Sequence, residues 1–296
     1  MVRAVSAPPF LTPPPGVRRL DIQTARGTFA ALEALPGSRP PERHPALLVP
    51  GLTGSKEDFI AVLMALTKDG RKVIAFDQRG QYETPGSADP GDYACAALAA
   101  DVGALLDELG AARVHLVGHS FGGLVAREVA IAEPSRLASV TLMSSGPAAI
   151  GGVAAERVRA LREALTGLEL AYIWDNHFGP EAVADGRPAE LIAFLRKRMI
   201  SNSPAGLTGM LDELLSAPDR VDVLAKVLDE SGPAALVLFG ADDDVWEPKV
   251  QAAMGVRLAA RTVVIPGAAH SPAVEAPDTT ADALTAFWTE AERTSS

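Results

Sequence analysis

The stretch from Arg113 to Gly123, RVHLVGHSFGG, joins an apolar run typical of a buried strand to a segment with helical spacing. It carries the pattern G-x-S-x-G around Ser120, where the strand gives way to the helix. Such a sharp turn presses together the residues two before and two after the serine, and here both are glycine. The turn would expose the serine hydroxyl beside free N–H groups of a helix N-terminus. The stretch therefore predicts a nucleophilic serine, with an ordinary glycine-rich turn as the alternative.

A serine hydroxyl needs a base to take its proton before it attacks, and the chain has five histidines. His270 follows the last apolar run, in VVIPGAAHSP, so it would lie at the carboxyl edge of a parallel sheet within reach of Ser120. His119 is adjacent to the serine, and we expect its side chain to be directed away. His177 lies in a helical region and is expected to line a pocket or to pack. We therefore assign the base to His270.

Three consecutive aspartates follow another apolar run, in VLFGADDDVWEP, at residues 237–248. They form the only acid cluster just past a predicted strand between Ser120 and His270. One carboxylate would orient the imidazole, while the other two would be solvated or would cap the helix from Pro248. No D-x-D-x-D-G loop or spaced histidine cluster accompanies them, so we predict no metal site and no cofactor.

Short apolar runs alternate with amphipathic segments along most of the chain, as in a mostly parallel sheet covered by helices on both faces. The sequence predicts an α/β fold with eight strands and a helical cap insertion. Strands are expected at 17–24, 27–35, 44–50, 72–77, 113–118, 139–144, 234–240 and 261–267. Helices are expected at 56–68, 93–109, 121–133, 248–260 and 278–293.

The alternation lapses near the middle of the chain, where the pattern is helical only. We expect this segment to lie over the carboxyl edge of the sheet, where such folds bind ligands. Its charged side chains are expected to face solvent, namely Arg157, Arg196, Lys197 and Arg198. The predicted units are a proline-rich N-terminal arm at 1–16, a core at 17–146 and 233–296, and a helical cap at 147–232.

Composition narrows the classes of function. The chain has 296 residues, 48% of them hydrophobic, which suits one large α/β domain with an insertion. A net charge of −10 argues against nucleic acid or an anionic membrane as partner. Cys95 is the single cysteine, and the first residues lack the apolar core of a signal peptide, so we predict a cytoplasmic protein. The sequence leaves open whether it forms a homo-oligomer.

Five segments together resemble the α/β-hydrolase fold superfamily, and within it the cap-bearing, cofactor-free, esterase-like branch. They are LLVPGLTGS, FDQRGQYETP, VGHSFGG, LFGADDDVWEP and IPGAAHSP, in the family's order. The resemblance implies that Ser120 is the nucleophile and His270 the base. It selects Asp243 as the acid, because the family places the acid three residues after the glycine that ends its strand. Asp244 is the alternative, since the next proline comes one residue later than is usual.

Two loops depart from the family pattern. The family's H-G turn is replaced by Pro50-Gly51-Leu52, and the resemblance implies that the N–H groups of Leu52 and Phe121 form the oxyanion hole. In the D-x-R-G-x-G-x-S loop, Tyr82 stands where the family has its second glycine. The backbone donors survive the first change, and the second would alter the loop.

The resemblance implies attack on a carbonyl, an acyl-enzyme at Ser120, and hydrolysis by a water that His270 activates. The expected reaction is cleavage of a carboxylic ester of a small, largely apolar substrate. Alternatives are thioester, lactone, amide or carbon–carbon bond hydrolysis, perhydrolase, lyase or acyl-transfer chemistry, and a ligand receptor with slow turnover. The expected pocket residues are Leu52, Thr53, Phe121, Trp174, Phe178 and Trp246. Alternatively, Trp174 and Phe178 only attach the insertion to the sheet.

Overall fold

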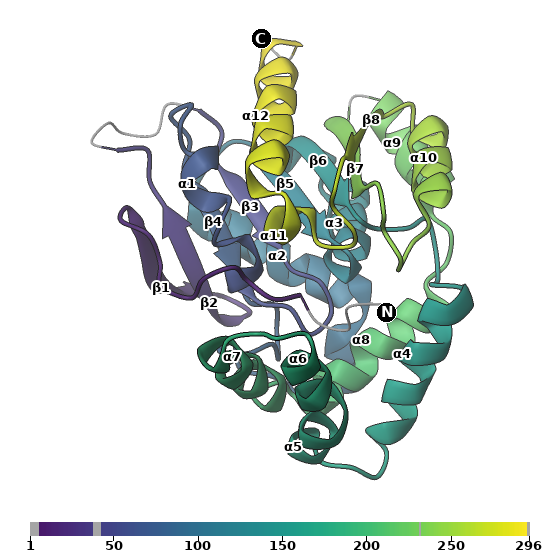
Figure 1. Ribbon diagram of the computed structural model, residues 1–296. Helices are drawn as coiled ribbons and strands as arrows, with labels where there is room; N and C mark the ends of the chain where they lie inside the picture. Colours follow the sequence, from purple (N-terminus) through teal and green to yellow (C-terminus); the bar gives the residue numbers. More distant parts are fainter. Residues whose placement is uncertain (1–5, 38–42, 231, 295–296) are drawn as a thin grey trace.

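An eight-stranded sheet forms the centre of the molecule (Figure 1). The computed structural model describes residues 6–37, 43–230 and 232–294. In spatial order the strands are β1 (Val17–Thr24), β2 (Gly27–Ala34), β4 (Val73–Phe76), β3 (Ala46–Val49), β5 (Val114–His119), β6 (Leu137–Met143), β7 (Ala234–Gly240) and β8 (Arg261–Ile265). Strand β2 runs antiparallel to both neighbours, and all other adjacent pairs are parallel. The prediction of a mostly parallel, eight-stranded α/β sheet is confirmed.

Helices cover both faces of this sheet, so its central strands are apolar at successive positions. Within β3, Leu47 belongs to one hydrophobic cluster and Leu48 to the other, because side chains alternate across a strand. The first cluster includes side chains of α2 (Cys95–Leu109), α3 (Phe121–Ala132), α9 (Val221–Asp229) and α10 (Pro248–Arg257). The second includes side chains of α1 (Leu63–Leu66), α11 (Pro272–Glu275) and α12 (Pro277–Thr294).

The helix predicted at 56–68 is interrupted in the structure. A 3-10 helix, Lys56–Phe59, is followed by the short helix α1. Both the backbone N–H and the ammonium group of Lys56 donate to the carboxylate of Asp77, each at 2.7 Å. These bonds tie the start of the segment to the loop after β4, and the chain makes a turn at residues 60–62 before α1 begins. The helix predicted from residue 93 likewise begins later, at Cys95, after a 3-10 helix at Pro90–Tyr93.

Between β6 and β7 the chain is helical, as its pattern predicts. The helices are α4 (Gly152–Ala164), α5 (Leu170–Ile173), a π-helical turn (Trp174–Phe178), α6 (Gly179–Ala184), α7 (Ala189–Ile200), α8 (Pro204–Ser216) and then α9. Figure 1 shows α4 to α8 gathered below the sheet, and we call these elements, with the turn between α5 and α6, the helical layer. Helix α9 lies apart from them and contacts α3 and α10.

The N-terminal arm runs to the helical layer before it enters β1. Its first five residues lie outside the described part of the chain, and Ser6 is the first that the structure describes. Ala7 packs against the hydrophobic cluster of the helical layer, and Pro8 is buried. In the described ranges, no helix is both long enough and apolar enough to cross a bilayer.

Candidate active site

Ser120 lies in a strained turn between β5 and α3. Its φ of 54° and ψ of −120° place a residue with a side chain in a region that glycine favours. A side-chain carbon at Gly118 would lie 2.1 Å from the carbonyl oxygen of Gly122, and one at Gly122 would lie 2.5 Å from the carbonyl oxygen of Pro50. Neither glycine can therefore be replaced without moving the backbone. The N–H of Ser120 donates to the carbonyl of Met143 at 2.8 Å, which ties the turn to the end of β6. The turn has the geometry that its glycine spacing predicts.

The structure brings Ser120, His270 and Asp243 together. Nε2 of His270 lies 2.9 Å from Oγ of Ser120, and Nδ1 lies 3.0 Å from Oδ1 of Asp243. A carboxylate only accepts, so Nδ1–H donates to Asp243 and Nε2 is left to accept the serine proton. The three residues are far apart in sequence and meet because β5, β7 and β8 end at the same edge of the parallel sheet.

Only one of the three consecutive aspartates faces the histidine. Asp243 is 4% exposed, whereas Asp242 and the alternative Asp244 are both exposed. Its carboxylate also accepts from the N–H of Val245 at 3.0 Å and from Nε2 of Gln251 at 2.8 Å. Burial alone would raise the pKa of Asp243, but His270 and these donors together hold that pKa below its ordinary value. The acid beside His270 is therefore ionised at neutral pH.

His119 does not point away from the site, so that expectation is wrong. Its Nε2 lies 2.7 Å from the carbonyl oxygen of His270, and the two rings are 5.1 Å apart. Strand alternation ends at Ser120, whose φ is positive, and the rule that neighbouring side chains diverge fails there. Burial, and then the nearby His270, lower the pKa of His119 to about 4. A neutral His119 donates to the His270 carbonyl, and this contact has no signal in the sequence.

The loop after β3 touches the serine. A side-chain carbon at Gly51 would lie 2.9 Å from Cβ of Ser120, so only glycine fits there. The carbonyl of Gly51 accepts from Nε2 of Gln81 at 2.8 Å, and the carbonyl of Pro50 accepts from Nε2 of Gln78 at 2.9 Å. These glutamines fix the loop, and no motif in the sequence predicted this role for them.

The two N–H groups expected to stabilise an oxyanion flank this contact. They belong to Leu52, which follows Gly51, and to Phe121, which opens α3 directly after Ser120. Across the described residues, neither N–H group has a hydrogen-bond acceptor. Both donors are thus available beside Ser120.

Tyr82 stands where the family loop has its second glycine, and its backbone is left-handed. Its φ is 42°, the left-handed value that a glycine would adopt freely. The ring packs edge-on against Phe194 of α7, with centroids 5.6 Å apart, and the ammonium of Lys56 lies 4.7 Å from its centroid. Tyr82 thus joins this loop to the helical layer.

A cavity of about 960 Å³ opens onto Ser120 and His270. Of the expected pocket residues, four line it: Leu52, Thr53, Phe178 and Trp246. Other apolar lining residues come from the helical layer, among them Leu161, Leu191 and Leu214. The cavity thus lies between the sheet edge and the helical layer.

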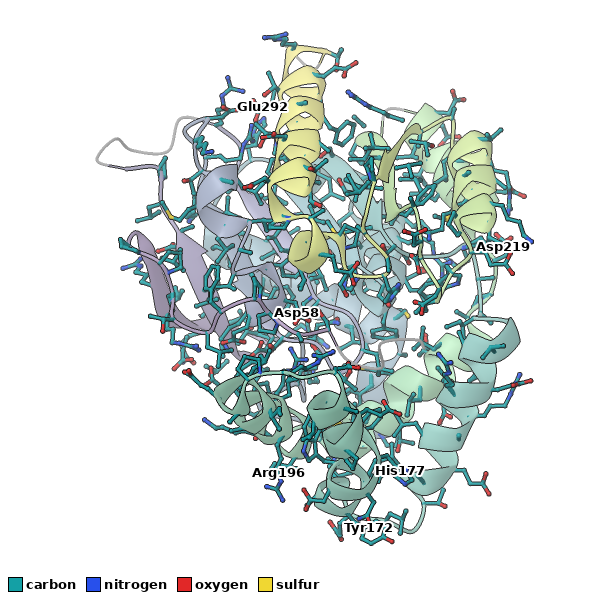
Figure 2. All side chains as sticks on the ribbon, viewed as in Figure 1. Asp58, Tyr172, His177, Arg196, Asp219 and Glu292 are labelled. Carbon is teal, nitrogen blue, oxygen red and sulfur yellow. The ribbon has the colours of Figure 1, made fainter. Side chains whose placement is uncertain are left out.

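Two aromatic residues and one histidine lie elsewhere than at the expected pocket. Trp174 is 2% exposed and packs with Leu195 in the interior of the helical layer, so it holds helices together instead of lining the cavity. Phe121 is fully buried in the main core, and its ring does not line the cavity. His177 is exposed and, with Tyr172, lies at the outer margin of the helical layer (Figure 2).

Arg198 is buried, although its charge predicted a solvent-facing side chain. It is 1% exposed and pairs with Asp58, Nη1 to Oδ1, at 2.8 Å. Asp58 is 3% exposed, lines the cavity, and lies between the sheet and the helical layer (Figure 2). Arg198 follows Arg196 and Lys197, which reach the surface, but a buried carboxylate brought close by folding holds it inside. Arg157 and Lys197 are exposed as expected, and Arg196 pairs with Asp175 at the surface.

Comparisons with known proteins agree with this arrangement. Residues 46–283 match the alpha/beta hydrolase family, and the chain belongs to that family. It is similar to a protein of Variovorax paradoxus that is provisionally named carbamate hydrolase RutD. The two are 43% identical over 106 residues, which cover 36% of this chain and 40% of that relative.

Solved structures are similar over nearly the whole chain. A thermophilic esterase from Thermogutta terrifontis is 26% identical, with a TM-score of 0.73, over 93% of this chain and 99% of that one. An enol-lactonase from Burkholderia xenovorans has the same TM-score at 19% identity, over 91% of this chain and 100% of that one. The second likeness concerns the fold alone.

Proposed function

We propose that the protein is a serine hydrolase that cleaves a carboxylic ester of a small, largely apolar substrate. One observation carries this proposal. At the wall of a cavity, Ser120 is hydrogen-bonded to His270 at 2.9 Å, and His270 is hydrogen-bonded to Asp243 at 3.0 Å. The helical layer supplies apolar side chains to the same cavity, and we propose that it acts as a cap over the substrate.

In the first half of the reaction, Oγ of Ser120 attacks the carbonyl carbon and its proton passes to Nε2 of His270. The negative oxygen receives hydrogen bonds from the N–H groups of Leu52 and Phe121. The imidazolium then gives its proton to the leaving alkoxide, the alcohol departs, and an acyl ester remains on Ser120. Asp243 stays ionised, holds the imidazole in one tautomer and stabilises its charged form.

In the second half, a water molecule attacks the acyl carbon and its proton passes to Nε2 of His270. The tetrahedral intermediate collapses, Ser120 regains its proton, and the carboxylic acid leaves. His119, which bonds to the His270 carbonyl, would keep the imidazole in place through both halves.

A carbamate is the second candidate substrate, and the likeness to the provisionally named carbamate hydrolase supports it. The same attack would release the alcohol and leave a carbamoyl ester on Ser120. The proposed steps stay the same, and the substrate differs only in the atom attached to the carbonyl carbon.

A steady-state assay with p-nitrophenyl acetate, p-nitrophenyl butyrate and a p-nitrophenyl carbamate tests both candidates. We expect multiple turnovers, with the larger kcat/KM for an ester. A larger value for the carbamate would make that the preferred substrate class. A single-turnover burst with every compound would contradict a hydrolase and indicate a receptor.

A further inference from the structure

The arm residues Ser6 to Pro9 lie along the cavity, although they belong to neither the sheet nor the helical layer. All four residues from 6 to 9 line it together with Ser120 and His270. Pro8 is buried there, and Ala7 packs against the hydrophobic cluster of the helical layer. Because two of the four residues are prolines, this part of the wall is stiff.

Arg198 fastens the arm to the rest of the protein. Its guanidinium reaches three acceptors: Nη1 donates to Asp58 at 2.8 Å and to Oγ of Ser55 at 3.4 Å, and Nη2 donates to the backbone carbonyl of Ser6. The planar fork of arginine can hold two such acceptors at once, whereas a lysine ammonium is a single point charge. The guanidinium also lies 5.4 Å from the ring centroid of Phe194. One buried side chain therefore joins the arm, helix α7 and the loop after β3.

We propose that residues 6–9 form a fixed wall of the substrate cavity that limits the size of the apolar group bound, and that Arg198 holds this wall in place. The substrate class rests on the proposed hydrolytic function, whereas the wall itself rests on the packing of the arm. A wall of this kind selects against acyl or alkyl groups long enough to reach Pro8, which lines the same cavity as Ser120.

The test uses Arg198→Lys and Pro8→Ala in the full chain. Lysine keeps the charge opposite Asp58 but cannot also hold the Ser6 carbonyl, so the arm is released. Alanine at position 8 removes ring atoms from the wall and breaks no hydrogen bond. The matched control is Arg196→Lys, two residues away on α7, where the arginine pairs with Asp175 at the surface.

The readout is the ratio of kcat/KM for p-nitrophenyl octanoate to that for p-nitrophenyl acetate. We expect the ratio to rise by roughly tenfold in both test variants, about the effect of one methylene in an apolar pocket. The Arg196→Lys control should keep the wild-type ratio. A ratio that is unchanged or lower in both test variants would overturn the proposal.

Binding of uncleaved amides separates this proposal from the hydrolytic function. Calorimetry with octanamide and propionamide should show the same shift toward the longer chain in Arg198→Lys and Pro8→Ala. If the wild type hydrolyses no ester but this shift occurs, the proposed function fails and the wall stands. If esters are hydrolysed and neither ratio moves, the function stands and the wall is wrong.

Discussion

In the described part of the molecule, a serine, a histidine and a carboxylate are hydrogen-bonded in a row at two places, and one of these two sets faces the cavity. At the carboxyl edge of the sheet, Ser120, His270 and Asp243 are linked at 2.9 and 3.0 Å. In the interior, Oγ of Ser139 lies 2.8 Å from Nδ1 of His115, whose Nε2 lies 3.0 Å from the carboxylate of Glu292. The hydrogen-bond lengths are nearly the same, but the two imidazole nitrogens have exchanged roles.

The two sets differ in their surroundings. Ser139 is fully buried within β6, directly opposite His115 in the parallel register with β5. His115 stacks on Trp288 of α12 with ring centroids 5.1 Å apart, and Glu292 lies on the same helix, far from the helical layer (Figure 2). This interior set joins the sheet to α12. Three hydrogen-bonded residues of this kind therefore make an active site only where a substrate and oxyanion donors can reach the serine.

The largest expected effect comes from removing the proposed nucleophile, Ser120, which lines the cavity. Ser120→Ala should lower kcat by about 10⁶-fold, as removal of a serine nucleophile does elsewhere, with the fold intact. Steady-state kinetics and circular dichroism check both parts. Wild-type activity in the variant would contradict the assignment of Ser120.

The next largest loss of kcat is expected at the three consecutive aspartates, residues 242–244. Asp243→Asn should cost on the order of 10⁴ in kcat, because the wrong imidazole tautomer would face the serine. Asp242→Asn and Asp244→Asn are matched controls, and as exposed residues they should cost under roughly tenfold. The three variants are assayed side by side. If Asp244→Asn is the impaired one, the acid has been misassigned while the serine and histidine keep their roles.

In the interior set, Glu292→Gln should change stability and leave activity in place. Glu292 accepts from Arg71 at 2.9 Å, and loss of its charge would leave that fully buried guanidinium poorly paired. We expect a loss of about 3 kcal/mol in the free energy of unfolding, measured by urea denaturation. Glu290→Gln is the control, because Glu290 pairs with Arg261 at the surface and should cost less than about 1 kcal/mol. Equal losses in the two variants would contradict the interior role.

Two buried histidines oppose folding when they are protonated: His115 in the interior set, and His119 beside His270. Burial is the main cause that lowers the pKa of His115, and that of His119, to about 4. Below the ordinary histidine pKa of about 6.5 the unfolded chain binds protons that the folded chain does not. Stability should therefore fall as the pH drops from about 6.5 toward 4, by on the order of 2 kcal/mol per histidine at pH 5.

Urea denaturation at pH 7 and pH 5 measures this dependence. His115→Gln should remove about half of the difference between the two pH values, because His119 retains its share. An undiminished difference would show that His115 is not a source of the acid sensitivity.

The smallest effect is expected at the second serine. Ser139→Ala should lower the free energy of unfolding by about 1 kcal/mol, the contribution of one hydrogen bond, and should leave kcat unchanged. Thermal denaturation and the ester assay measure the two quantities. A large fall in kcat would contradict the division between the two sets.

Local patterns predicted the sheet and the ends of its strands well. The period of the apolar residues depends on neighbours along the chain, so the eight strands and the turn at Ser120 could be predicted without a structure. His270 and Asp243 were found because both follow such strand ends, where parallel strands bring distant segments to one edge. The acid also required the family resemblance, since three adjacent aspartates have the same chemistry.

The errors have one physical origin, which is contact between residues far apart in the sequence. Arg198 follows two surface residues on its helix, and nothing nearby predicts that Asp58, 140 residues away, will hold it inside. His119 turns toward a carbonyl 151 residues away, and Lys56, at the start of the helix predicted at 56–68, bonds to Asp77 in the loop after β4. A pattern of apolar residues shows which face is buried, but it does not show which charged group finds a partner there.

The sequence by itself determined the order of strands and helices along the chain, the strained turn at Ser120 and the residues that follow each strand. Local sterics and apolar periodicity are properties of short segments, so they can be recognised in the amino-acid sequence. Only the tertiary structure decided which serine of two is accessible, which aspartate of three meets His270, and that the N-terminal arm lines the cavity. These choices depend on burial and on partners brought together by folding, which no short segment contains.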